Sequence, residues 1–167
     1  MIRIHKLEKK EQALIDQSVL FIKGIIKDDF GYEINSAWHD DFLKLEKYYL
    51  NTRSCFYVLV VAGEIVGTIA ARPYDKKYEY FKNRYNSVNT LSIWRHYIKK
   101  DLRSMGLGSK LLFKALSFAN KKGYKYLYLH TQKNIKGSVE YWLSKGFKIT
   151  KDVGDEFHTV HMEKVII

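Results

Sequence analysis

The feature that most constrains the fold is a glycine-containing turn that joins an apolar, β-branched run directly to a helical pattern. The run ends at Ile98, the turn contains Gly106 and Gly108, and apolar residues recur at helical spacing from Leu107 onwards. The first N–H groups of a helix have no partner within the helix and lie at the positive end of its dipole, so they suit an anion. Glycine lets a ligand approach the backbone closely. The stretch therefore predicts a strand–turn–helix unit that binds a diphosphate.

Two common phosphate-binding motifs do not fit this turn. A P-loop requires Lys and then Ser or Thr after its last glycine, whereas Ser109 and Lys110 follow Gly108 in the opposite order. A dinucleotide-binding fingerprint requires a third glycine at the position of Leu111. The remaining pattern is Arg-x-x-Gly-x-Gly, which starts at Arg103 after a strand that ends Tyr-Ile-Lys-Lys-Asp-Leu.

Length and composition indicate one folded domain over residues 1–167. The chain is 46% hydrophobic and 15% aromatic, and no stretch rich in Pro, Gly or Ser divides it. No apolar run is long enough for a membrane span, and the first residues do not resemble a signal peptide. The single cysteine, Cys55, cannot form an internal disulfide, which favours a reducing compartment. We therefore expect a cytoplasmic protein without a membrane partner; its oligomeric state stays open, and a homodimer is one alternative.

The formal net charge of +11 favours an anionic partner but does not identify it. Nucleic acid is the competing partner, yet the chain has neither the cysteines of a zinc finger nor a basic helix free of apolar residues. A solvated, lysine-rich surface accounts for most of the excess. Four cations, expected to be mobile, surround the glycine turn: Lys99, Lys100, Arg103 and Lys110.

Hydrophobic periodicity predicts the element order β-α-α-β-β-β-α-β-α-β-β. Ser36 is the expected N-cap of the second helix, with Trp38, Phe42, Leu45 and Tyr49 on one apolar stripe. The expected helices cover about Lys9–Lys27, a stretch after Ser36, a stretch from Leu107 and about Gly137–Lys145. The expected strands are Ile2–His5, Cys55–Val61, Glu64–Ala71, Leu91–Ile98, Tyr124–Thr131, Phe147–Lys151 and Phe157–Ile166.

The segment from Arg72 to Asn89 interrupts this order. It contains Pro73 and five Tyr or Phe residues interleaved with lysines. Long loops are often lids or binding loops, so we expect a substrate-shaping, aromatic-walled pocket, with a short helix or strand as the alternative.

A second motif extends the pattern. Residues 138–147, Ser-Val-Glu-Tyr-Trp-Leu-Ser-Lys-Gly-Phe, resemble the Ala-x-x-Phe-Tyr-x-x-x-Gly-Phe segment of the GNAT superfamily of N-acyltransferases, and Arg103–Gly108 resembles its acyl-CoA-binding signature. The resemblance covers essentially the whole chain after Cys55 and is looser before it. It implies an α+β fold with α/β/α layers, in which a mixed, mostly antiparallel sheet has about six to seven strands.

The resemblance also implies where acetyl-CoA binds. The turn would hold the pyrophosphate through backbone N–H groups, and the end of the preceding strand would pair with the pantetheine arm as an added strand does. Divergence of that strand from the one at Tyr126–His130 would admit the thioester. The cofactor-binding residues implied are Tyr97, Ile98, Lys99, Arg103, Ser104, Met105, Gly106, Leu107, Gly108, Ser109, Asn134 and Trp142.

The catalytic residues are harder to assign. The family often places Glu or His on the strand before the turn, but Ser92 and Trp94 occupy those positions. Strict alternation would put His96 on the same face, and its usual pKa suits a proton acceptor, so His96 is the candidate base; a structural histidine is the alternative. Counting back from Gly146-Phe147 puts Trp142 at the family's acid position, whereas a helical stripe shared with Val139 and Leu143 indicates that Trp142 packs. Tyr141 is therefore the candidate proton donor.

Other residues offer weaker sites. Cys55 lies in an apolar run and is expected to be structural, and His158 and His161 lie on opposite faces of a strand, so no metal site is expected. Asn134 could equally serve a turn. The implied activity is acetyl-CoA-dependent acetylation of a primary amine of a small molecule or peptide. The alternatives are a CoA-sensing module that has lost its chemistry and a basic nucleic-acid-binding domain.

Overall fold

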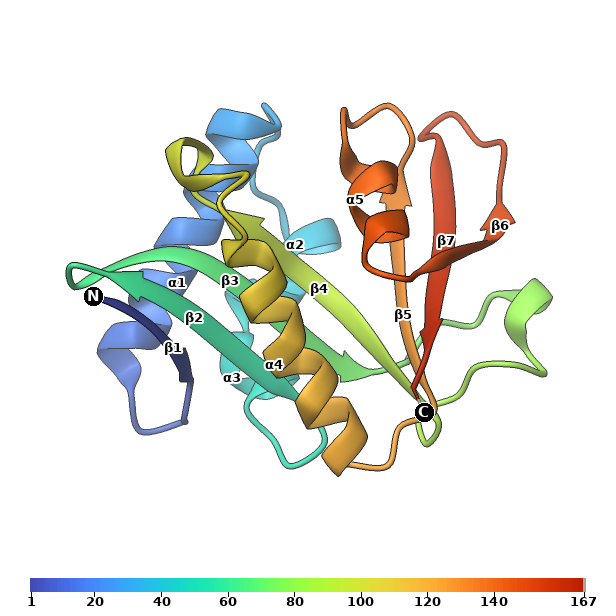
Figure 1. Ribbon diagram of the computed structural model, residues 1–167, viewed down its shortest axis with the longest axis horizontal. Helices are drawn as coiled ribbons and strands as arrows, with labels where there is room; N and C mark the ends of the chain where they lie inside the picture. Colours follow the sequence, from blue (N-terminus) through green and yellow to red (C-terminus); the bar gives the residue numbers. More distant parts are fainter. Residues whose placement is uncertain (167) are drawn as a thin grey trace. The chain divides into compact units, whose positions relative to one another are not determined.

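The computed structural model of the protein describes residues 1–166, which form two compact units. The first unit contains Met1–Arg72 and Trp94–Ala115, and the second contains residues 73–93 and 116–166. Strand β4 (Thr90–Ile98) and helix α4 (Leu107–Lys121) each contribute residues to both units (Figure 1).

The seven strands follow the order β1-β2-β3-β4-β5-β7-β6 in one sheet. Strands β4 and β5 pair parallel, whereas β1–β2, β2–β3, β5–β7 and β6–β7 pair antiparallel. The expectation of a mixed, mostly antiparallel sheet in an α+β fold is thus confirmed, as is the order of the elements, except that the expected second helix is divided into Ser36–Leu43 and Leu45–Tyr49. The other strands are β1 (Ile2–Lys6), β2 (Cys55–Val61), β3 (Glu64–Pro73), β5 (Tyr126–Gln132), β6 (Lys148–Asp152) and β7 (Thr159–Val165). The other helices are α1 (Gln12–Gly24), α2 (Ser36–Leu43), α3 (Leu45–Tyr49) and α5 (Ser138–Ser144).

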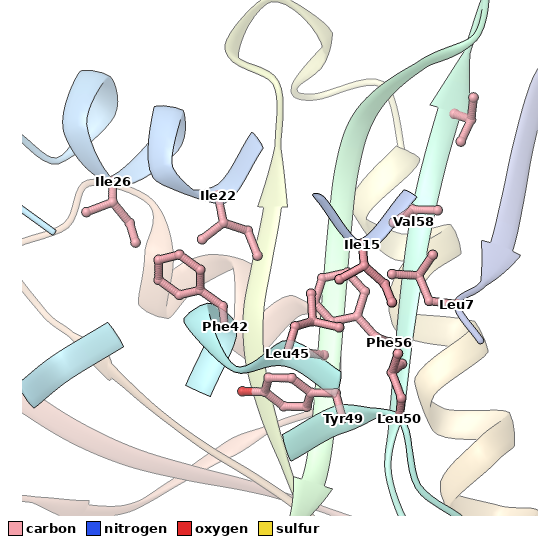
Figure 2. Close-up of a cluster of buried hydrophobic side chains, with 12 residues drawn as sticks. Leu7, Ile15, Ile22, Ile26, Phe42, Leu45, Tyr49, Leu50, Phe56 and Val58 are labelled. Carbon is pink, nitrogen blue, oxygen red and sulfur yellow. The ribbon is translucent and has the colours of Figure 1, made fainter. Parts of the chain in front are cut away.

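The core of the first unit lies between α1, α2, α3 and one face of β2 and β3. Apolar residues at helical spacing on α1, such as Ile15 and Ile22, meet Phe42 of α2 and Phe56 of β2, and all four are buried (Figure 2). Tyr49 of α3 is also fully buried there. This packing fixes α2 against the strands, which matters for the site below.

The first half of α4 covers the opposite face of the same strands, as Figure 1 shows with α4 in front of β3. Gly67 of β3 allows this approach: a Cβ at that position would lie 2.8 Å from Ile98 Cδ1 and 3.2 Å from Leu111 Cδ1. Ile98 at the end of β4 therefore faces α4.

The second unit has its own aromatic core. Tyr74, Phe81 and Tyr85 pack with Tyr128 of β5, and all four are buried. The segment that precedes β4 is thus ordered by ring packing, with one short 3₁₀ helix at Glu79–Phe81. The expected aromatic-walled pocket is wrong for these three side chains, because they fill a core instead of lining an opening.

Two local details of the α2–α3 region also differ from expectation. Asn35, not Ser36, caps α2: its side chain accepts a hydrogen bond from the Trp38 N–H at 3.0 Å, and its extended backbone suits that role. The His39 ring in turn accepts from the Asn35 N–H at 2.9 Å. Trp38 does not share the buried stripe, since 65% of it is exposed.

Candidate active site

The turn before α4 has the backbone geometry of an anion-binding helix start. Ser104 and Gly106 adopt positive φ angles of 63° and 78°, and the helix begins at Leu107. The Lys110 N–H bonds the Gly106 carbonyl at 3.3 Å, so Leu107, Gly108 and Ser109 occupy the first turn. Their N–H groups have no acceptor within the helix, because an α-helix leaves its first donors unpaired. The predicted strand–turn–helix unit is present.

Arg103 holds this turn in place. Its Nε donates to the Ile98 carbonyl at 2.8 Å, and its guanidinium forms an ion pair with Asp29 at the end of a π-helix, Ile25–Asp29. The expectation that Arg103 is a mobile cation is wrong, because both contacts tether it to the first unit. Lys99 also has a partner, Glu64, with Nζ and Oε2 3.8 Å apart. Lys100 and Lys110 are exposed beside the turn and remain the cations that could reach a phosphate.

Strand β4 reverses its faces at Arg95, which has a positive φ of 46°. Trp94 and Tyr97 both pack toward the core formed with α1–α3, although they are three residues apart. Strict alternation would place them on opposite faces. The expectation that His96 shares a face with Trp94 is therefore wrong: a β-bulge-like irregularity shifts His96 and Ile98 to the other face.

His96 is partly buried and held by the backbone of β3. Its Nδ1 lies 3.3 Å from the Thr68 carbonyl oxygen, which makes Nδ1 the donor and Nε2 the acceptor of the neutral ring. Burial lowers the pKa of His96 to about 4, because the charged imidazolium loses its hydration. The ring is therefore neutral near pH 7, and its basicity is low.

The parallel pairing of β4 with β5 is short. It joins Thr90–Ser92 to Tyr126–Tyr128, although β4 continues to Ile98. The backbone of β4 beyond Ser92 is therefore not paired with β5, and its edge groups at Tyr97 and Ile98 are not used in that ladder. The Lys99 N–H bonds the Val66 carbonyl of β3 at 2.8 Å, so the strand end is fixed from its other side.

The remaining predicted site residues, Asn134, Tyr141 and Trp142, belong to the second unit. Trp142 is 8% exposed and packs edge-on against Phe147, with ring centroids 5.1 Å apart, whereas Leu143 of the same predicted stripe is 48% exposed. The contact of Trp142 with the cofactor stays a prediction. Tyr141 is half-buried, and Lys145 Nζ lies 5.4 Å from its ring centroid. Asn134 is exposed in the turn between β5 and α5.

Two further kinds of site could lie among residues 1–166: a reactive thiol and a metal centre. Burial raises the pKa of the Cys55 thiol to about 12, which makes it a poor nucleophile. Among residues 1–166, no group of three His, Cys, Asp or Glu side chains could hold a metal ion. A hollow of about 900 Å³ lies between α1 and the α2–α3 segment, lined by residues such as Gln12, Asp16 and Lys47. None of the predicted site residues lines it.

The sequence did not predict the buried cluster formed by Asp41, Arg95, Arg72 and Tyr49. Asp41 of α2 accepts two hydrogen bonds from Arg95, and a third, at 2.5 Å, from the Tyr49 hydroxyl. Arg72 donates to that hydroxyl at 2.7 Å and lies over the Trp94 ring at 4.3 Å. The available signal was a charged residue inside an apolar run: Arg95 follows Ile-Trp in β4, and Asp41 precedes Phe-Leu in α2.

Comparisons with known proteins identify a family. Residues 20–147 match the model of the acetyltransferase (GNAT) family. Mouse N-acetyltransferase 8 is 30% identical over 132 residues, which are 78% of this chain and 55% of the relative. Human N-acetylaspartate synthetase is 28% identical over 116 residues, or 69% of this chain and 35% of the relative. The chain thus spans between a third and just over half of these curated relatives.

A solved structure supports the same fold. An acetyltransferase of the GNAT family from Staphylococcus aureus superposes with a TM-score of 0.78 at 20% identity, covering 100% of both chains. Within residues 1–166, none of the helices combines the length and apolar character that a membrane crossing requires. The match over residues 20–147, more than half of the chain, establishes that this protein belongs to the acetyltransferase (GNAT) family.

Proposed function

We propose that the chain is an acetyl-CoA-dependent N-acetyltransferase that transfers the acetyl group directly to a primary amine of a small molecule or peptide. The observation that carries the proposal is the open helix start at Leu107–Ser109 in a chain of a family that uses acetyl-CoA. Its N–H groups suit the diphosphate of CoA. The edge of β4 at Tyr97 and Ile98 lies beyond the ladder with β5 and offers backbone partners for the amides of the pantetheine arm, with the Ile98 carbonyl shared with Arg103 Nε.

In this proposal the acceptor nitrogen attacks the thioester carbonyl, the carbon–sulfur bond breaks, and CoA leaves as the thiolate. An alkylamine with a pKa of about 10.4 must first lose its proton, which costs roughly 4–5 kcal/mol near pH 7. Desolvation, His96 or a water must offset that cost. We retain His96 as the candidate base and Tyr141 as the candidate donor of a proton to the thiolate.

Residues 1–167 act as one domain in this proposal, since the family match at residues 20–147 includes parts of both compact units. A cytoplasmic location is part of the proposal as well, because the single cysteine, Cys55, is a buried free thiol. The amine panel below leaves the acceptor open, because the name of N-acetyltransferase 8 gives no acceptor and that of N-acetylaspartate synthetase gives aspartate.

The test is release of free CoA thiol from acetyl-CoA in the presence of an amine panel. The panel contains aspartate and other amino acids, a polyamine, an aminoglycoside and an unblocked peptide. Thiol release that depends on one of these amines supports the enzyme. Acetyl-CoA binding without release under every condition supports the CoA-sensing module instead, and salt-sensitive binding of DNA without any acetyl-CoA binding supports the nucleic-acid alternative.

Replacing His96 with glutamine tests the base. We expect turnover to fall by roughly 10²-fold with unchanged acetyl-CoA affinity, which is near the lower end for a general base because its pKa is far from neutral. A base must be unprotonated, so the wild-type rate should fall only as the pH drops through about 4, the pKa of the buried His96. That acid limb should disappear in the variant. Wild-type turnover in His96→Gln would show that His96 is not the base and would leave the structural alternative.

Replacing Tyr141 with phenylalanine tests the acid. The change removes one hydroxyl group and keeps the ring that packs against Trp142, with centroids 5.0 Å apart. We expect turnover to fall about tenfold or more, while the thermal midpoint stays close to that of the wild type. Trp142→Phe is the matched variant and should instead lower stability, because Trp142 is buried. Full activity in Tyr141→Phe would mean that the thiolate leaves unaided or through water.

A further inference from the structure

We propose that Asp41 of α2 positions the cofactor-binding end of β4 by holding Arg95 at the point where the strand reverses its faces. The inference rests on the proposed function in one respect: it takes Tyr97–Lys99 as the backbone that meets acetyl-CoA. Asp41 and Arg95 are positioning residues, since neither needs to contact the substrate.

Arg95 adopts a conformation that its side chain disfavours. A φ of 46° is uncommon for a residue with a Cβ, and such residues persist where the surrounding structure fixes them. The fixing contacts come from α2: Nε donates to Asp41 Oδ2 at 3.0 Å, and Nη2 donates to Asp41 Oδ1 at 2.7 Å. Nη2 also donates to the Trp38 carbonyl at 2.9 Å. Only 11% of the Arg95 side chain is exposed. Besides Asp41 and the Trp38 carbonyl it contacts the Phe42 ring, whose centroid lies 5.0 Å from Arg95 Cζ.

The backbone at Arg95 is also satisfied from the side of β3. The Thr68 hydroxyl donates to the Arg95 carbonyl at 2.8 Å, and the Thr68 carbonyl faces the His96 ring at 3.3 Å. A side-chain hydroxyl of β3 thus supports the backbone of β4 at this position. Because the reversal starts here, it determines which groups of Tyr97, Ile98 and Lys99 lie on the open edge of β4.

Asp41 is itself fixed. The Tyr49 hydroxyl donates to it, and Arg72 Nη1 lies 3.8 Å from its Oδ2. Burial by itself would raise the pKa of Asp41, but the hydrogen bonds and charge of Arg95 outweigh it and leave the pKa below its usual value. Two well-packed apolar side chains would serve stability as well as this buried ion pair. What the pair adds is a bidentate geometry, which fixes the direction of the arginine and hence of its backbone.

Arg95→Gly tests whether the contacts between Arg95 and Asp41 position the end of β4, because this variant removes the contacts without adding backbone strain. Glycine accepts a positive φ without a steric penalty, so the variant loses the contacts to Asp41 without straining the backbone. We expect the KM for acetyl-CoA to rise by about tenfold or more, because a displacement of about 1 Å in a binding strand can have effects of up to 10²-fold. Amide hydrogen exchange at residues 96–99 should be faster than in the wild type, without any ligand present.

Two further variants complete the experiment. Asp40→Asn is the matched control: Asp40 is adjacent to Asp41 but pairs with Lys44 and Tyr48, so KM and exchange should equal those of the wild type. Arg95→Lys keeps the charge but not the bidentate geometry and should lie between Arg95→Gly and the wild type. It also provides a measurement if the glycine variant does not fold.

The outcomes separate this inference from the proposed function. If the wild type does not bind acetyl-CoA in calorimetry, the proposed function fails, while the exchange comparison in the free proteins still decides whether Asp41 and Arg95 hold β4. Wild-type exchange at residues 96–99 in both Arg95→Gly and Arg95→Lys would overturn the inference. Faster exchange with an unchanged KM would also overturn it, because the cofactor would then not depend on this end of β4.

Discussion

Replacing Gly108 with valine should abolish measurable acetyl-CoA binding while the protein stays folded. Gly108 is the second residue of α4, in the first turn whose N–H groups are proposed to meet the diphosphate. A β-branched side chain there would keep the phosphates away from the donors. Loss of two hydrogen bonds to a charged group, at roughly 1.5–3 kcal/mol each, corresponds to about 10²–10⁴-fold weaker binding. Isothermal titration calorimetry with acetyl-CoA measures this directly.

Gly24→Val is the control for the same chemical change. Gly24 lies in α1 with helical backbone angles, and a Cβ at that position would have no neighbour within 4 Å. Valine has a slightly better helix propensity than glycine, so neither variant should lose stability through its backbone. Wild-type affinity in Gly108→Val would contradict the assignment of the diphosphate to this turn. Equal losses in both variants would point to a general effect on folding.

Replacing Glu163 with alanine should give the largest loss of stability that we expect. Glu163 of β7 is fully buried and accepts hydrogen bonds from Arg84 Nε and from the Tyr85 hydroxyl, both at 2.8 Å. These contacts tie the segment before β4 to the sheet of the second unit. Breaking a buried pair from one side typically costs about 3–5 kcal/mol, and here it also leaves the Tyr85 hydroxyl without its carboxylate. We expect the thermal midpoint to fall by roughly 6–20 °C.

The pH dependence of stability provides a second measurement on Glu163. Burial by itself would raise the pKa of Glu163, but the hydrogen bonds from Arg84 and Tyr85 outweigh it and hold the pKa below its usual value. A lowered pKa contributes stability above the unfolded value of about 4.3 and loses it as the pH falls further. Wild type and Glu163→Ala should therefore converge in stability in acid.

Asp152→Asn is the control in the same unit. Asp152 of β6 pairs with Lys133 at 2.7 Å, but both side chains are about half exposed, so the pair is worth at most about 1 kcal/mol. A stability loss in Glu163→Ala no larger than in Asp152→Asn would show that the buried carboxylate does not anchor the aromatic segment.

The glycine turn and the order of the elements could be read from the sequence, because both depend on near neighbours. A helix start needs only the residues that form it, so Gly106, Gly108 and the apolar pattern after Leu107 were sufficient. For Trp142 the sequence allowed two interpretations, because its helical stripe with Val139 and Leu143 indicated packing whereas motif counting placed it beside the thioester. The two motifs then pointed to the family that the comparison over residues 20–147 established.

Tertiary structure decided the rest. The faces of β4 reverse at Arg95, whose guanidinium contacts Asp41, 54 residues earlier in the chain, and no period-2 pattern contains that information. Arg103 forms an ion pair with Asp29 and is therefore not a mobile cation, and the two residues are close together only in the folded chain. The aromatic side chains of the segment before β4 are buried because Tyr128 packs against them and Glu163 accepts a hydrogen bond from the Tyr85 hydroxyl. In each case the side chain's role depends on a charge or a ring brought close by folding, whereas the sequence alone specifies only what each residue could do.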